Sequence, residues 1–438
     1  MKIKVGSVYS TIEPEQRDWN KNRMCMRDLK NAFKAKIKNS YWIQKKSGWD
    51  GTIRFIDYNG RFRTGLLPSV LRWCKENGYR YEIKKPNGLD SRVVTAMGDK
   101  KLRSWQEDML QACLKWKRGI INAATNAGKS FVFPFLVESY QNPKTLILTN
   151  RVKVMEAILE NFETVGTINA DGFNPANVTV AMDKSLLNYC NSANVLKYLN
   201  EVELLIVDEC HWASGKGYTK LIDQIGAYHR FFFSGTSLDG KDEVQTGTLV
   251  GMAAPVIYQI SNQDMIEAGQ SKDVEVIIIE NHCNEIKPYK ENLSVNVKQS
   301  IGRLRGLTEQ IVGKALILTQ WTEHAELIAR ALKCEFTHSK DSQKNEKIHN
   351  FKQSCNGILV STMIISEGVN IDGIDTVVWA GAGMSVRMIK QSIGRGLRGG
   401  DGKLRVIDFM DADGGKLESH SRSRINTYEK EGFLVTKK

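Results

Sequence analysis

The stretch Gly119-Ile120-Ile121-Asn122-Ala123-Ala124-Thr125-Asn126-Ala127-Gly128-Lys129-Ser130 places a short apolar run directly before a loop of small residues. Small residues let backbone N–H groups close around phosphates, a lysine reaches the β- and γ-oxygens, and a hydroxyl holds Mg²⁺. A helix beginning near Gly128 would add the positive end of its dipole to the same site. The pattern predicts a phosphate-binding loop, with Ala123 where a glycine is usual and with these nucleotide-binding residues: Thr125, Asn126, Ala127, Gly128, Lys129 and Ser130.

A second acidic element follows about eighty residues later. The apolar run Leu204–Val207 is typical of a strand buried on both faces, and it ends in Asp208-Glu209-Cys210-His211. An aspartate at the tip of such a strand can hold Mg²⁺ through its water shell, and the neighbouring glutamate can activate the attacking water. Adjacent acids are also common at exposed strand ends. Because this pair follows a phosphate loop in the sequence, we instead predict that Ser130 and Asp208 hold the metal ion and that Glu209 activates the attacking water.

A third element lies far downstream in Gln391-Ser392-Ile393-Gly394-Arg395-Gly396-Leu397-Arg398. Two arginines three residues apart share one face of a helix, and arginine suits bidentate contact with phosphate oxygens. An arginine finger stabilises charge on a transferring phosphoryl group. Taken alone, the stretch is equally typical of a solvated basic helix.

The order and spacing of the three elements resemble those of the superfamily 2 helicases and translocases, over residues of about 100 to 410. The resemblance implies an ATP-hydrolysing nucleic-acid motor with ATP and Mg²⁺ as cofactors and with Lys129, Asp208, Glu209, Arg395 and Arg398 as catalytic residues. It also implies nucleotide contacts for Gln106, Gly368 and Gln391, and nucleic-acid contacts for Thr149, Ser361 and Thr362. Ser234-Gly235-Thr236 is similar to the motif that couples ATP state to domain movement. Asn370 departs from the family, where aspartate is frequent.

Alternation of apolar runs with helix-length segments predicts an α/β fold with parallel sheets. The resemblance implies two RecA-like motor domains preceded by a small α+β N-terminal domain. We expect a basic nucleic-acid-binding domain over 1–90, the first motor domain over 91–245, the second over 246–412 and a C-terminal tail over 413–438. Strands are predicted at Gly119–Asn122, Thr145–Thr149, Val178–Ala181, Leu204–Asp208, Arg230–Ser234, Ala315–Thr319, Ile358–Thr362, Thr376–Ala380 and Arg405–Asp408.

Positive charge is concentrated at the N-terminus. Residues 1–100 hold 22 lysines and arginines against 10 aspartates and glutamates, a surplus of 12, whereas the whole chain of 438 residues carries +13. Such an excess predicts a surface that meets phosphates, and we expect Arg54 and Arg61 to contact nucleic acid. The same region is rich in aromatic residues. Rings beside cations can stack on unpaired bases, but we interpret most of these as the core of the small domain.

Within this N-terminal region, Gly48-Trp49-Asp50-Gly51, Asp57-Tyr58-Asn59 and Gly65-Leu66-Leu67 are similar to the N-terminal domain of the phage UvsW-type helicases. That family migrates Holliday junctions, regresses forks and unwinds D-loops and R-loops. The resemblance therefore implies a role on branched DNA in recombination, repair and replication. Two alternatives stay open: an RNA helicase, and a double-stranded DNA translocase that separates no strands.

The remaining composition is that of an intracellular protein. No run of eighteen apolar residues indicates a membrane span, and the N-terminus lacks the apolar core of a signal peptide. The eight cysteines are scattered without a Cys-x-x-Cys pair, which disfavours a metal cluster or a disulfide framework. We expect a cytoplasmic monomer (in the host cytoplasm if the protein is phage-encoded) with DNA as partner and no membrane contact.

Overall fold

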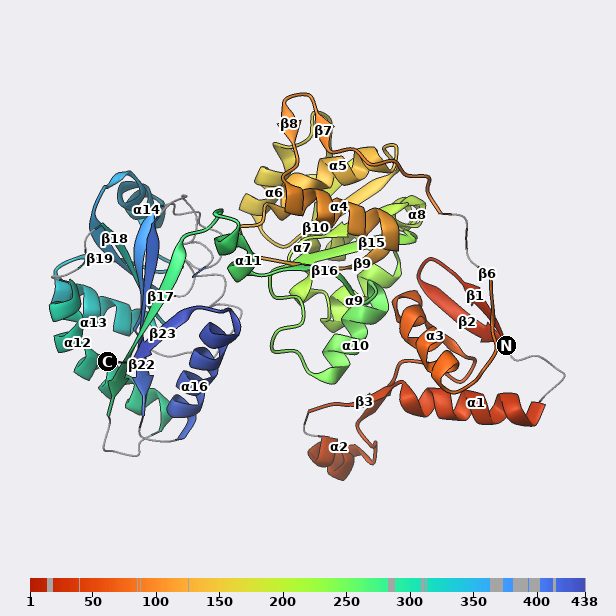
Figure 1. The fold of residues 1–438 in the computed structure, drawn as a ribbon, viewed down its shortest axis with the longest axis horizontal. Coiled ribbons are helices and arrows are strands. Elements are labelled where there is room, and N and C mark those ends of the chain that lie inside the picture. The colour runs from red at the N-terminus through yellow and green to blue at the C-terminus, as the bar shows by residue number, and fades with distance from the viewer. Residues whose placement is uncertain are drawn as a thin grey trace. The chain divides into compact units, whose positions relative to one another are not determined.

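The chain forms two compact units. The first unit consists of Met1–Ala123 and Gly128–Gln259, and the second consists of Ala124–Ala127 and Ile260–Lys438. The structure is a computed structural model, and each unit is described by itself (Figure 1). It describes residues 1–13, 19–38, 40–84, 86, 88–124, 126–282, 288–308, 311, 313–362, 373–380, 393, 402–412 and 415–437. The predicted fold class is confirmed, because both units are built on parallel sheets with helices between the strands.

The first unit begins with a small sheet in the order β5-β2-β1-β6, made by Arg61–Arg63, Tyr9–Glu13, Lys2–Val5 and Glu82–Lys84. Helices α1 (Trp19–Ala32) and α3 (Leu67–Glu76) accompany this sheet, and Pro68 lies in the first turn of α3. A separate antiparallel ribbon pairs β3 (Lys34–Lys36) with β4 (Thr52–Arg54), and helix α2 (Ser40–Ser47) joins the two strands. This is the predicted α+β N-terminal domain.

The core of this domain is mainly aliphatic, which makes our interpretation of its aromatic rings wrong. Ile3, Ile12, Leu29 and Val70 are buried, and Phe62 is the fully buried ring. Phe55, Trp73 and Tyr79 only pack against this core, whereas five rings are exposed: Tyr41, Trp42, Trp49, Tyr58 and Tyr81. A short sheet of three- to five-residue strands has one narrow inner face, which small aliphatic side chains already fill.

The first motor sheet has eight strands in the order β12-β11-β13-β10-β14-β15-β9-β16. The parallel strands from β11 to β9 are Gly166–Asn169, Val178–Met182, Thr145–Thr149, Leu204–Val207, His229–Ser234 and Arg118–Ala123. The outer strands are β12 (Gly172–Asn174), which is antiparallel to β11, and β16 (Val256–Ile260). All five strands predicted for this unit are present.

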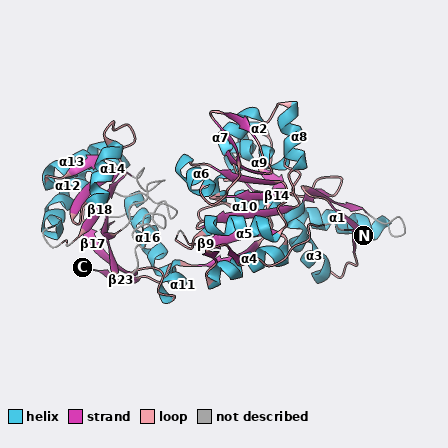
Figure 2. Ribbon diagram, turned by 90° about the horizontal axis from the view of Figure 1, so that it is seen from above, coloured by secondary structure: helices cyan, strands magenta, loops and turns pink. Residues whose placement is uncertain are grey.

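Both faces of this sheet are covered by helices, as Figure 2 shows from above. Alternate side chains of the central strands pack on the helices that follow β13, β14 and β15, namely α7 (Asp183–Tyr189), α8 (Ala193–Glu201), α9 (Lys216–Asp223) and α10 (Glu243–Met252). Rings such as Phe233 face the other side, where Phe133 of α5 (Val132–Ser139) lies 4.9 Å away between ring centroids. Burial on both faces explains why these strands are continuous apolar runs.

The remaining helices of this unit are α4 (Ser104–Trp116) and α6 (Val152–Leu159). A short ribbon of β7 (Ala96–Met97) and β8 (Lys100–Lys101) precedes α4.

The small domain is joined to the first motor sheet by polar contacts that are buried or partly buried. Arg63 forms a bidentate ion pair with Asp223 at the end of α9, with Nη2–Oδ2 at 2.8 Å, and the Tyr9 hydroxyl donates to the same carboxylate at 2.9 Å. Arg118 of β9 donates to the carbonyls of Ser7, Met252 and Ala253. These contacts join the small domain to the first motor sheet within the first unit.

The second unit has a seven-stranded sheet in the order β19-β20-β18-β21-β22-β17-β23, with every neighbouring pair parallel. Its strands in this order are Glu335–Thr337, Gly357–Thr362, Lys314–Thr319, Ile374–Trp379, Lys403–Asp411, Asp273–Asn281 and Leu434–Lys437. Its helices are α11 (Asn262–Glu267), α12 (Tyr289–Thr308), α13 (Thr322–Leu332), α14 (Lys344–Gln353) and α16 (Gly415–Lys430). The sequence analysis missed β17, β19 and β23. The C-terminal tail contributes β23, an edge strand of this sheet.

Helix α16 brings a charged network into the core of the second unit. Arg424 is fully buried and forms a bidentate ion pair with Asp408, with Nε–Oδ2 at 2.8 Å and Nη2–Oδ1 at 2.9 Å. The Tyr428 hydroxyl donates to Asp408 at 2.7 Å. Beside this pair, burial raises the pKa of the Asp411 carboxyl to about 6, although Arg424 and Asn296 oppose the shift.

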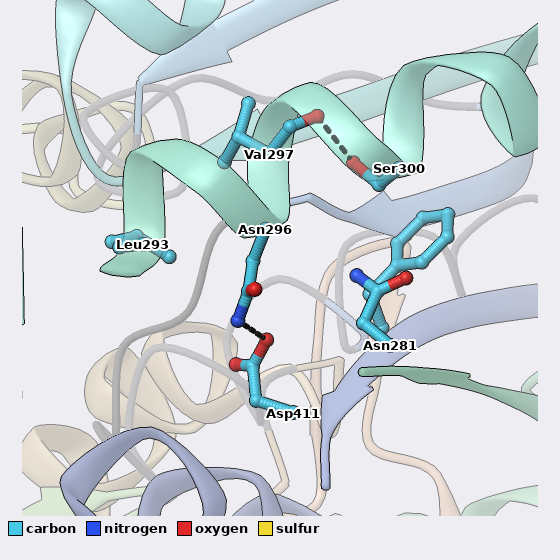
Figure 3. Close-up of a pocket in the computed structure, with 7 residues that line it drawn as sticks. Asn281, Leu293, Asn296, Val297, Ser300 and Asp411 are labelled. Atoms are coloured by element: carbon cyan, nitrogen blue, oxygen red, sulfur yellow. Dashed lines mark hydrogen bonds between the residues drawn. The ribbon is translucent and has the colours of Figure 1, made fainter. Parts of the chain in front are cut away.

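A small cavity of about 10 Å³ adjoins this network, between α12 and the end of β22 (Figure 3). Figure 3 shows Asn296 of α12 pointing toward Asp411, to which its amide donates a hydrogen bond. A cavity of this size holds a single water molecule at most. It is therefore part of the internal packing and cannot serve as a nucleotide site.

The four-part division expected from the sequence stays a prediction. Within the described residues, no helix is both long and apolar enough to cross a membrane.

Candidate active site

Four loops of the first unit meet at one edge of its sheet. Because β9, β10, β14 and β15 are parallel neighbours, their carboxyl ends lie together. In open α/β sheets this edge is where ligands bind. The four loops carry Gly128–Ser130 of the phosphate loop, the Thr149–Arg151 segment, Asp208-Glu209, and Ser234-Gly235-Thr236.

The phosphate loop is held in shape from behind by Gln106. Its Nε2 donates to the Gly128 carbonyl at 3.3 Å, while its Oε1 accepts from the Arg103 N–H at 3.0 Å. Gly128 has φ +70°, and a Cβ there would lie 2.4 Å from Gln106 Nε2. Only glycine fits this position without displacing Gln106, since both the backbone conformation and the space exclude a side chain.

Lys129 follows at the start of a 3₁₀ turn, Lys129–Phe131, which leads into α5. The helix predicted from Gly128 thus begins with a tighter turn, as helix N-termini often do. The Lys129 side chain is buried, and its Nζ donates to the Ala123 carbonyl at 3.2 Å, across the mouth of the loop. Ser130 lies in the same turn. Ala127 is buried, and together with Asn126 it belongs to the short segment that is grouped with the second unit.

Asp208, which is buried, and Glu209, which is partly buried, form a pair of carboxyls at the tip of β14. Burial and the neighbouring Glu209 raise the pKa of Asp208. Burial also acts to raise the pKa of Glu209, but His211, Lys129 and Arg151 outweigh it and lower that pKa. Lys129 and Arg151 act on both carboxyls, so the structure brings the phosphate loop and the acidic pair into one electrostatic site.

Arg151 is a residue that the sequence analysis missed. It lies two residues after the end of strand β10 and directly before helix α6. Its sequence signal is a cation in the loop that follows a predicted strand of the motor sheet. Since β10 and β14 are neighbours, that position places its charge beside the acidic pair.

Glu209 is oriented by a second loop. Its backbone is left-handed, with φ 48° and ψ 46°, which turns the side chain away from the direction of the strand. The Ser234 hydroxyl donates to Glu209 Oε2 at 3.2 Å and accepts the Thr236 N–H at 3.1 Å. His211 Nδ1 lies 3.3 Å from the same carboxylate oxygen. The Ser234-Gly235-Thr236 segment thus contacts the acidic pair directly.

The segment after Glu209 is tied down at three points. Trp212 Nε1 donates to the Asp208 carbonyl at 3.2 Å. Lys241 Nζ donates to the His211 carbonyl at 2.6 Å and to the Ser214 hydroxyl at 3.0 Å. These contacts anchor the segment that follows the acidic pair.

The residues predicted to contact nucleic acid divide into two groups. Thr149, Ser361 and Thr362 are buried at strand ends, and the Ser361 hydroxyl donates to the Thr362 carbonyl at 2.9 Å. Arg54 and Arg61 are exposed on the small domain; Arg54 lies 3.6 Å from Asp50, and the Arg61 guanidinium lies 3.9 Å from the centroid of the Tyr9 ring. Thr125, Gly368, Gln391, Arg395 and Arg398 lie outside the described residues, and their roles stay predictions.

Two family models match the chain. The model described as "Type III restriction enzyme, res subunit" covers residues 99–238, and the "Helicase conserved C-terminal domain" covers residues 296–400. These are the two halves of a helicase motor, in the order that the sequence predicts. The chain is an ATP-hydrolysing helicase of superfamily 2.

Individual proteins resemble this helicase over most of its length. It is 23% identical to the ATP-dependent DNA helicase uvsW of Enterobacteria phage T4, over 88% of this chain and 89% of that protein. It is also 23% identical to a DNA 3'-5' translocase of Sulfurisphaera tokodaii, over 74% of this chain and 85% of that protein. A fragment of a proposed HsdR subunit of a type I restriction enzyme from Vibrio vulnificus has the same fold, with TM-score 0.63 at 16% identity, covering 91% of this chain and 82% of that one.

Replacing Ser234 with alanine is expected to lower the kcat of ATP hydrolysis about tenfold and to leave ATP affinity unchanged. The change removes one hydrogen bond to a buried carboxylate, a loss of about 1–3 kcal/mol. Steady-state phosphate release measures the effect. Ser237→Ala is the matched control, because the Ser237 hydroxyl donates to Asn122 Oδ1 and not to a carboxylate. Equal losses in the two variants would contradict a specific role for Ser234.

Proposed function

We propose that this helicase separates and branch-migrates the strands of branched DNA, such as forks, Holliday junctions, D-loops and R-loops, in recombination, repair and replication. The relative from phage T4 is named as an ATP-dependent DNA helicase and aligns over 88% of this chain. The positive surplus of the first hundred residues supports binding to phosphates. Exposed Arg54 and Arg61 are proposed contacts. We also propose that the protein acts in the cytoplasm of a host cell, as a monomer.

We further propose that ATP and Mg²⁺ bind at the edge formed by the four loops. The residues at this edge fit a metal ion. The carboxyls of Asp208 and Glu209 are neighbours, and burial together with Glu209 raises the pKa of Asp208. A cation bound there would relieve the repulsion between the two carboxylates. Ser130 and Asp208 would hold the metal, which supplies charge neutralisation at the phosphates. Lys129 would exchange its hydrogen bond to the Ala123 carbonyl for contacts with the β- and γ-phosphate oxygens of ATP.

Glu209 is proposed to take the proton of the attacking water. Its carboxylate is ionised at neutral pH, since His211, Lys129 and Arg151 lower its pKa, and Ser234 fixes its direction. A carboxylate held in this way can accept a proton without first rotating into place. Arg395 and Arg398 are proposed to stabilise charge on the transferred phosphoryl group.

ATP hydrolysis across a panel of nucleic acids tests this function. The panel holds single-stranded DNA, linear duplex, a fork, a four-way junction and an RNA duplex, with Lys129→Ala as the inactive control. We expect forks and junctions to stimulate hydrolysis most, and a quenched-fluorophore fork to be unwound. Stimulation by RNA alone would indicate an RNA helicase. Equal stimulation by linear duplex and junctions, without unwinding, would indicate a translocase of the kind named for the Sulfurisphaera relative.

A further inference from the structure

Helix α2 and the loop after it present large aromatic side chains to solvent at the tip of the β3–β4 ribbon. Tyr41 is 67% exposed, Trp42 is 61% exposed and Trp49 is 41% exposed. The rings of Tyr41 and Trp42 meet edge to face, with centroids 5.6 Å apart, and Lys45 Nζ lies 5.9 Å from the centroid of Trp42. Figure 1 shows α2 as the outer end of this ribbon. Rings gathered in this way on a surface mark a site of interaction.

The ribbon that carries α2 is firmly built. Ile37 N–H donates to the Gly51 carbonyl at 2.9 Å, and a Cβ at Gly51 would lie 2.5 Å from Ser40 Cβ, so the two ends of the tip are packed closely. Behind the ribbon, the Phe55 ring packs on Gly247 of α10, where a Cβ would lie 2.3 Å from the ring. The ribbon is therefore packed against α10, a helix that covers the first motor sheet.

The charge around the tip favours nucleic acid as the occupant. Between residues 34 and 54 the basic side chains are Lys34, Lys36, Lys38, Lys45, Lys46 and Arg54, and the one acidic side chain is Asp50. Asp50 already has Arg54 as its neighbour. Aromatic rings interleaved with lysines suit unpaired bases with their phosphates, because each base stacks on a ring while the lysines neutralise the backbone.

We propose that Tyr41 and Trp42 form a stacking platform for the unpaired bases of single-stranded DNA, with Lys45 and Lys46 on the phosphates. The platform rests on the proposed function, in which it holds one separated strand next to the motor. Because the ribbon is packed on α10, each movement of the first motor sheet carries the bound strand with it. This placement would prevent the separated strands from pairing again behind the junction.

Equilibrium binding of a fluorescent oligo(dT) without ATP tests the platform. Tyr41→Ala/Trp42→Ala should weaken binding about tenfold or more, and Tyr41→Phe/Trp42→Phe should retain it within about twofold, because phenyl rings still stack. Lys45→Gln/Lys46→Gln should reduce the salt dependence of binding by a slope of about one to two. Trp116→Ala is the matched control: Trp116 is 55% exposed on α4 and has Lys115 Nζ 5.6 Å from its centroid.

The outcomes separate this proposal from the proposed function. The alanine pair should also unwind a fork more slowly at an unchanged rate of duplex-stimulated ATP hydrolysis and with an unchanged melting temperature. If wild-type protein fails to unwind any fork, the proposed function fails, but the oligo(dT) comparison still decides on the platform. Wild-type oligo(dT) affinity in the alanine pair would overturn the platform. Binding to phosphatidylserine vesicles is measured for the same variants. If the alanine pair lost vesicle binding but kept oligo(dT) binding, the platform would also be overturned, and the rings would be assigned to a membrane surface.

Discussion

Replacing Glu209 with glutamine is expected to reduce the kcat of ATP hydrolysis by about a hundredfold to ten-thousandfold. Glutamine has the same shape, and its amide oxygen can still accept the Ser234 hydrogen bond of 3.2 Å. What it loses is the negative charge that accepts the proton of the attacking water. Because the left-handed backbone at residue 209 is retained, the geometry of the site should stay intact. ATP affinity should therefore change by less than about threefold.

Two measurements check this prediction. Phosphate release at saturating DNA gives kcat, and calorimetric titration with ATP gives affinity. Glu201→Gln is the matched control, since Glu201 lies on the same unit in a surface ion pair with Lys144 at 2.6 Å. Surface pairs contribute about 0–1 kcal/mol, so this variant should hydrolyse ATP normally. If Glu209→Gln lost affinity as strongly as turnover, the carboxylate would be positioning the nucleotide instead of activating water.

The central strands could be predicted from the sequence because they are buried on both faces. Leu204–Val207 and Thr145–Thr149 consist almost entirely of apolar or β-branched residues, as expected in a parallel sheet. Edge strands such as β12 and β23 have no such pattern. Gly172–Asn174 is only partly buried, and Leu434 is exposed, so only their hydrogen-bonded neighbours define them.

The acidic pair and the phosphate loop could also be predicted, because each is contiguous in sequence. The contacts that join them could not. Ser234 is 25 residues from Glu209, and Arg151 lies on yet another loop, so their meeting depends on the strand order β10-β14-β15-β9. Spacing along the chain does not reveal which strands are neighbours. Composition likewise does not reveal which face of a small domain its rings occupy, as Tyr41 and Trp42 show.

Replacing Arg424 with methionine is expected to destabilise the second unit by about 3–5 kcal/mol, because Asp408 would be left buried without its cation. Both side chains are almost inaccessible to solvent, with 0% and 1% exposure. Arg424 also donates to the Phe409 carbonyl at 3.0 Å and to the Ser421 hydroxyl at 3.1 Å. The pair raises the pKa of Arg424, against the effect of burial. For a unit of this size the loss corresponds to a melting temperature lower by about 10 °C.

A second substitution separates loss of the pair from loss of packing. Asp408→Asn added to Arg424→Met removes the buried charge while an amide oxygen still accepts from Tyr428, so the double variant should recover a large part of the lost stability. Arg422→Met is the matched control on the same helix, since Arg422 is 68% exposed and pairs with Glu418 at the surface. Scanning calorimetry reports all three variants. If the double variant melted as low as Arg424→Met, the cost would come from the cavity left by the arginine, and the buried charge would not be its cause.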